Sequence, residues 1–84
     1  MSLPEPRAEV VRGARRGDPA SFEKIVSLYE GLVFNFAYRM TWNREDAREM
    51  CQEVFFRLFR NFHKYQHEKK FGPWFMKLAV STSD

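Results

Sequence analysis

Apolar residues recur along the chain at helical spacing, and no stretch alternates between apolar and polar residues as a half-buried strand would. The pattern predicts a short amphipathic helix over residues 7–16 and then a long core helix. Asp18 is the expected N-cap of the long helix and Pro19 its first residue, where a missing N–H costs nothing. Over about six turns its apolar positions are Phe22, Ile25, Val26, Tyr29, Leu32, Val33, Phe36, Ala37 and Met40.

The next stretch, from Asn43 to about Phe62, divides most sharply into an apolar and a charged side. At about 100° per residue, the apolar arc holds Ala47, Met50, Cys51, Val54, Phe55, Leu58 and Phe62. The other side holds Asp46, Glu49, Gln52, Glu53 and Arg57, with Phe56 among them. Asn43, followed three residues later by Asp46, is expected to cap this third helix.

Phe56 is the residue that this pattern does not explain as core. A solvated helix face has no need of a phenylalanine between carboxylates, whereas a protein interface gains most from an aromatic anchor surrounded by polar groups. We therefore interpret the charged side of the third helix as a docking surface.

A basic segment follows the third helix and leads into a fourth. Its cations are Lys64, Lys69 and Lys70, with His67 between them, and the nearby aromatic residues are Tyr65, Phe71 and Trp74. The lysines are suited to phosphates and the rings to unstacked bases, which favours single-stranded nucleic acid over a duplex groove. The alternative is that Phe71 and Trp74 pack inward and that the lysines only solvate the loop.

The fourth helix is expected to start near Pro73 and to reach Asp84 without a glycine or other stop signal. We therefore expect the sequence to be a fragment of a longer protein. The predicted fold is all-α: a compact bundle of three long helices plus a short fourth helix, forming one domain over residues 1–84 with a flexible tail over residues 1–6.

Composition narrows the class of protein. With 84 residues and 17% aromatic residues, the chain has enough apolar mass for one small folded domain. The N-terminus has no signal-peptide pattern, and no stretch is long and uncharged enough to cross a bilayer, so a cytoplasmic location is expected. The single cysteine, Cys51, excludes an internal disulfide and is expected to be a buried, inert thiol.

The sequence offers little for catalysis, and no cofactor is expected. His63 and His67 are four residues apart, and Glu68 or Cys51 could complete a metal site, but the pair lies beyond the helical pattern, so the spacing does not fix a shared face. The carboxylates Asp46, Glu49 and Glu53 share a helical face, where docking or solvation explains them better than general acid chemistry. We expect a binding protein rather than an enzyme.

A set of motifs in order resembles the second region of the extracytoplasmic-function sigma factors of bacterial RNA polymerase. The motifs are Gly17-Asp18-x-x-Ser21-Phe22, Tyr29, Asn43-x-Glu45-Asp46-Ala47, Gln52-Glu53-Val54-Phe55-x-Arg57 and Phe71-x-x-Trp74-x-x-x-Leu78-Ala79. Two positions depart from the family, whose members often have Gly where Trp42 stands and Asn where Ser81 stands. The family's C-terminal helix-turn-helix domain, which binds the minus-thirty-five element, has no counterpart in this sequence.

The resemblance implies a sigma factor domain with two binding surfaces. Glu49, Gln52 and Glu53 match the positions that meet the clamp helices of the largest polymerase subunit, and Asp46 and Phe56 lie on the same face. The loop from Tyr65 to Lys70 and the fourth helix match the part that recognises and melts the minus-ten element, pocketing an unpaired base. An anti-sigma factor could cover the docking helix. The alternative function is a helical protein-binding adaptor without DNA recognition.

Overall fold

The computed structural model describes residues 3–66 and 68–82, and all the regular structure in them is helical, as the sequence predicted. The elements are α1 (Ala8–Arg15), α2 (Pro19–Thr41), α3 (Arg44–Asn61), the 3-10 helix η1 (Phe62–Lys64) and α4 (Phe71–Thr82). The shortest α-helix is α1, with 8 residues, rather than α4, which has 12. Helix α4 also begins two residues before Pro73.

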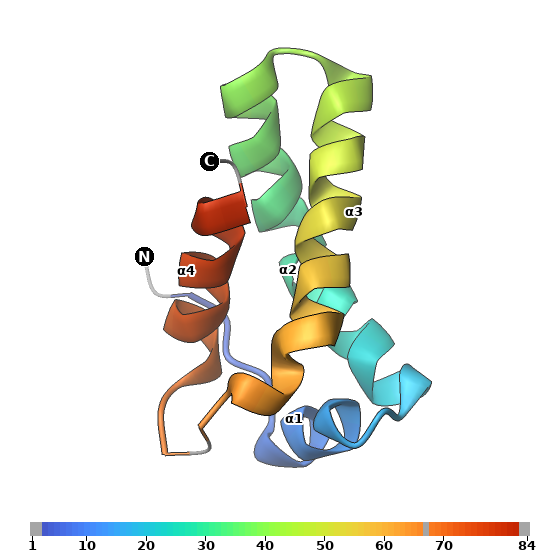
Figure 1. The fold of residues 1–84 in the computed structure, drawn as a ribbon, viewed down its shortest axis with the longest axis vertical. Coiled ribbons are helices and arrows are strands. Elements are labelled where there is room, and N and C mark those ends of the chain that lie inside the picture. Colours follow the sequence, from blue (N-terminus) through green and yellow to red (C-terminus); the bar gives the residue numbers. More distant parts are fainter. Residues whose placement is uncertain (1–2, 67, 83–84) are drawn as a thin grey trace.

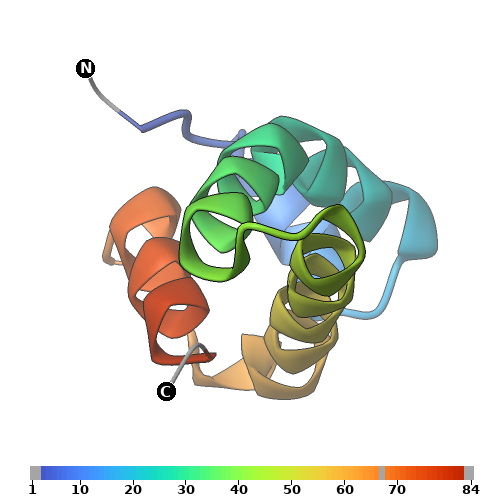
Figure 2. The same ribbon diagram turned by 90° about the horizontal axis from the view of Figure 1, so that it is seen from above.

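Helices α2 and α3 form an antiparallel pair, and the other elements pack against it (Figure 1). Helix α1 packs against the start of α2, and α4 packs against α3. Figure 2, viewed along the bundle, shows the short connection that joins α2 to α3 at one end, with α4 as a separate rod. The loop between η1 and α4 lies at the opposite end, near α1 (Figure 1).

The two predicted caps are confirmed. The Asp18 carboxylate accepts a hydrogen bond from the Ser21 N–H at 3.2 Å and another from the Ser21 hydroxyl at 2.7 Å, and these bonds lower the pKa of Asp18. The Asn43 side-chain oxygen accepts a bond from the Asp46 N–H at 3.0 Å. Each cap satisfies an N–H group that has no partner within its own helix.

Trp42 closes α2 in an unusual conformation. Its φ of 54° lies in the left-handed region, and its N–H donates to the Tyr38 carbonyl at 2.8 Å. Glycine is the usual residue at such a helix end because it has no Cβ to clash with the backbone. The Trp42 side chain is 76% exposed, so burial does not offset this strain.

The core is mainly aromatic and joins all the helices. Its buried members include Ile25, Tyr29, Val33, Val54, Phe55, Leu58, Phe62, Tyr65, Phe71, Phe75 and Ala79. Phe71 stacks on Phe75 with ring centroids 5.9 Å apart and interplanar angle 8°. The prediction that Leu32 and Met40 belong to the core was wrong, because they are 38% and 56% exposed. They lie on the apolar arc of α2, but this arc is wider than the face that the neighbouring helices cover.

The first described residues cross the bundle instead of trailing from it. We call residues 3–7 the N-terminal strap; the Pro4 carbonyl accepts a hydrogen bond from the Tyr29 hydroxyl, and Glu5 contacts the start of α4. The sequence predicted a flexible tail over residues 1–6; within it Pro4 and Glu5 make these contacts, and residues 1–2 lie outside the described part. In the described ranges no helix is both long and apolar enough to span a membrane.

Candidate functional site

The charged side of α3 is open to solvent, as the sequence predicted. Asp46, Glu49, Gln52 and Glu53 are all exposed. Phe56 is 56% exposed, and the Arg60 guanidinium carbon lies 4.9 Å from the centre of its ring. The cation over the ring orients Phe56 without burying it. The face therefore presents an aromatic side chain beside carboxylates, which is the arrangement expected of a docking anchor.

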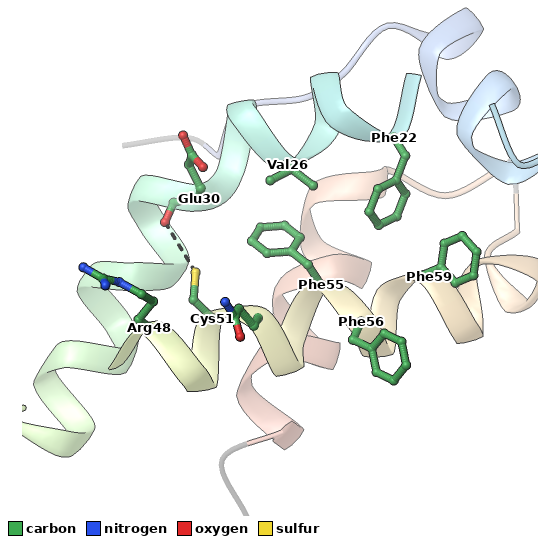
Figure 3. A pocket seen from close by; sticks show the side chains of 9 residues that line it. Phe22, Val26, Glu30, Arg48, Cys51, Phe55, Phe56 and Phe59 are labelled. Carbon is green, nitrogen blue, oxygen red and sulfur yellow. Dashed lines mark hydrogen bonds between the residues drawn. The ribbon is translucent and has the colours of Figure 1, made fainter. Parts of the chain in front are cut away.

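An apolar groove of about 610 Å³ adjoins Phe56 and runs between α2 and α3 (Figure 3). Its apolar walls are Phe22 and Val26 from α2 and Cys51, Phe55, Phe56 and Phe59 from α3. Glu30, Arg48 and Gln52 complete the lining. The exposed ring of Phe56 and the groove beside it together form a concave apolar surface, which fits an apolar side chain of a partner.

Sequence reasoning missed this groove. Phe22 and Val26 were assigned to the core, yet both are only half-buried, and Phe59 is 61% exposed. The rings of Phe22 and Phe59 meet edge to face with centroids 5.7 Å apart. The position of Phe59, three residues after Phe56 and outside the apolar arc, was the signal that could have revealed a second exposed ring.

Cys51 also differs from the prediction of a buried thiol. It is half-buried, lines the groove, and its Sγ lies 4.0 Å from the Glu30 carbonyl oxygen. Burial, together with the charge of Glu30, raises the pKa of Cys51. The thiol therefore stays protonated at neutral pH, which agrees with the expected low reactivity.

Around the basic loop, which joins η1 to α4, the lysines are exposed but two of the three aromatic rings are buried. Lys64, Lys69 and Lys70 are exposed, and His67 lies outside the described residues. Tyr65 is only 5% exposed, and Phe71 is fully buried. The prediction that Tyr65 presents an open face to bases was therefore wrong, whereas Phe71 follows the alternative in which its ring packs inward.

The buried rings instead hold the loop together. Tyr65 packs edge-on against Phe71 at 5.4 Å and lies 5.2 Å from Trp74, while its hydroxyl donates to the Lys69 carbonyl. Trp74 is half-buried and keeps part of its ring accessible. Of the rings proposed for base stacking, Trp74 alone keeps that possibility.

Two hollows flank the loop, the first with a mixed lining and the second mainly polar. The first, about 280 Å³, lies between the N-terminal strap and the loop, and Glu5, Tyr65, Glu68, Lys69 and Lys70 are among its lining residues. The second, about 480 Å³, lies toward α1, and is lined by Arg15, His63, Lys64, Tyr65, Gln66 and Glu68. The cations of the loop therefore surround concave surfaces and not a flat face.

The described residues contain no group of three His, Cys, Asp or Glu side chains that could hold a metal ion. His67, one of the two histidines considered for such a site, lies outside them. The geometry of the described part thus offers two candidate binding surfaces, the α3 face with its groove and the basic loop.

Comparisons with known proteins identify the family of the chain that carries these surfaces. Residues 25–83 match Sigma-70 region 2. The chain is 28% identical over 73 residues to the ECF RNA polymerase sigma factor SigW of Bacillus subtilis (strain 168), covering 87% of this chain and 39% of the relative. It is 37% identical over 68 residues to the ECF RNA polymerase sigma factor SigE of Mycolicibacterium smegmatis, covering 77% and 26%. The chain thus spans well under half the length of these relatives.

Proposed function

Because the chain belongs to the Sigma-70 region 2 family, we propose that it binds core RNA polymerase and recognises the minus-ten promoter element during the initiation of transcription. The matched relatives are named as RNA polymerase sigma factors, which supports this function. We propose that the chain acts in the cytoplasm as a binding module with no catalytic step of its own.

The exposed ring of Phe56 beside the apolar groove is the observation that carries the polymerase part of the proposal. We propose that the clamp helices of the largest subunit cover the α3 face and place an apolar side chain in the groove. Glu49 and Glu53 would then face cationic side chains at the rim of the interface, where they favour correct orientation and fast association. An anti-sigma factor that covered the same groove would prevent docking.

The exposed lysines carry the DNA part of the proposal. Lys69 and Lys70 would contact phosphates of the nontemplate strand, and a flipped base would enter a hollow beside the loop. Extracting a base costs a few kcal/mol of stacking, and contacts in the hollow and with Trp74 return part of that cost. Melting would therefore draw on binding free energy alone, without nucleotide hydrolysis.

Fluorescence anisotropy with a single-stranded minus-ten oligonucleotide tests the DNA part. The chain, alone or with core polymerase, should bind this oligonucleotide more tightly than a scrambled one of equal composition. Lys69→Glu and Lys70→Glu should each weaken binding and reduce the slope of log affinity against log salt by about 0.7 for each lost phosphate contact. Lys24→Glu, a charge reversal at an exposed lysine of α2, is the matched control.

A second candidate function, a helical protein-binding adaptor, is favoured by one observation. The aromatic residues Tyr65 and Phe71 are explained by core packing and need no nucleic acid. An adaptor would bind the minus-ten and scrambled oligonucleotides equally, and Lys69→Glu would then affect both to the same extent. Such a result would reject the proposed promoter recognition.

A further inference from the structure

The first turn of α4 is capped by a residue from the opposite end of the chain. Glu5 Oε2 accepts a hydrogen bond from the Phe71 N–H at 2.6 Å, and Oε1 accepts one from the Gly72 N–H at 2.9 Å. The N–H groups of a first turn have no partner within their helix, and the positive end of the helix dipole favours a carboxylate there. Glu5 thus supplies a cap that the sequence immediately before α4 does not.

The strap is built for this contact. Pro4 and Pro6 flank Glu5, and proline restricts both its own φ and the preceding residue to extended conformations. A Cβ added at Gly72 would lie 3.0 Å from Glu5 Oε1, 3.2 Å from the Pro4 carbonyl oxygen and 3.3 Å from the Tyr29 hydroxyl oxygen. The absence of a side chain at position 72 therefore lets the strap lie directly on the start of α4.

The cap is connected to the basic loop through partly buried contacts. Glu5 accepts a hydrogen bond from the Phe71 N–H, and the Phe71 ring packs against the ring of Tyr65. The Tyr65 hydroxyl in turn donates a hydrogen bond to the Lys69 carbonyl. Glu5 and Lys69 also line the same hollow of about 280 Å³. Burial, with the nearby charges of Glu5 and Glu68, raises the pKa of Tyr65, so its hydroxyl remains a donor at neutral pH.

We propose that Glu5 is a positioning residue for promoter recognition, which caps α4 and keeps the loop from Tyr65 to Lys70 in the shape that meets DNA. This inference rests on the proposed function. The competing interpretation is that Glu5 occupies a place where a DNA phosphate would bind, so that it opposes DNA binding. The close approach at Gly72 favours positioning, because a phosphate is larger than a carboxylate and would displace the strap.

Substitution of Glu5 separates these interpretations. Glu5→Ala removes both hydrogen bonds and should weaken binding of the single-stranded minus-ten oligonucleotide about fivefold, the size of effect expected for a lost cap. Glu5→Gln keeps one acceptor oxygen and should bind with intermediate affinity. Glu9→Gln is the matched control, since it removes one negative charge from an exposed side chain that pairs only loosely with Arg7 at 3.7 Å.

A second variant tests the contact from its other side. Gly72→Ala leaves all charges in place but adds a Cβ 3.0 Å from Glu5 Oε1 and 3.2 Å from the Pro4 carbonyl oxygen, so both atoms must shift and the two hydrogen bonds must lengthen. It should therefore weaken DNA binding in the same direction as Glu5→Ala. Binding to core polymerase should stay within about twofold of the parent for every variant, because the α3 face is not altered. This split between DNA and polymerase binding is a result that general destabilisation would not give.

Three results would overturn the inference: unchanged DNA binding by Glu5→Ala and Gly72→Ala, tighter DNA binding by Glu5→Ala, or equal loss of DNA and polymerase binding. Tighter binding would identify Glu5 as a competitor of the phosphate instead. If the parent chain itself showed no preference for the minus-ten oligonucleotide, the proposed function would fail first, and the inference with it.

Discussion

Truncation of Phe56 is the sharpest test of the α3 docking surface, and the structure sets the size of the effect. Phe56 is 56% exposed. A phenylalanine buries about 200 Å² when fully covered, so roughly 110 Å² remains for a partner to cover. At about 25 cal/mol per Å², this area contributes between about 2 and 3 kcal/mol to docking. Alanine retains a small part, so Phe56→Ala should cost about 2 kcal/mol, or roughly thirtyfold in Kd.

The assay is titration of core polymerase with the fluorescently labelled chain, with competition by each unlabelled variant. Met40→Ala is the matched control, because Met40 is also 56% exposed but lies near the end of α2. Circular dichroism should show unchanged helical content for both variants, since neither side chain belongs to the buried core. If Phe56→Ala bound within about twofold of the parent, or if Met40→Ala weakened binding equally, the assignment of this surface would be refuted.

Three further predictions concern stability. Asn43→Ala should lower the free energy of unfolding by about 1 kcal/mol through loss of the α3 cap, seen as a lower urea midpoint at constant m-value. Trp42→Gly should raise thermal stability, because the left-handed backbone at φ 54° is strained for tryptophan and free for glycine; a lower Tm would show that ring contacts outweigh the strain. Burial chiefly, and the charge of Glu5, raise the pKa of Tyr29 in the folded chain. The folded state therefore favours the neutral phenol, and the contribution of Tyr29 to the free energy of unfolding is complete below pH ~10 and declines as the pH rises above that value. Tyr29→Phe should remove this decline in urea titrations between neutral and alkaline pH.

The features that the sequence predicted well are local. Helical periodicity placed Val54, Phe55 and Leu58 in the core and Phe56 outside it, because each depends on position around a single helix. The caps at Asp18 and Asn43 were predictable for the same reason, since donor and acceptor are three residues apart.

The features that the sequence did not predict depend on contacts between distant segments. Tyr65 looks like an exposed loop residue until η1 and α4 bring its ring against Phe71, and the sequence left the inward packing of Phe71 as one of two alternatives. Helix α4 begins at Phe71 and not at Pro73, and its first N–H is satisfied by Glu5, 66 residues away in the sequence. The groove beside Phe56 forms only where α2 meets α3, so no single stretch contains its pattern.

The strap also determines the order in which the domain can be completed during synthesis. Residues 3–7 are translated before their partners Phe71 and Gly72, so the contact cannot close until the segment through Gly72 has left the ribosome. The α2–α3 hairpin can pair earlier, through contacts nearer in sequence. We therefore expect the contact between the strap and α4 to form after the α2–α3 hairpin has paired, so that α3 is in place before the loop that leads into α4 is ordered.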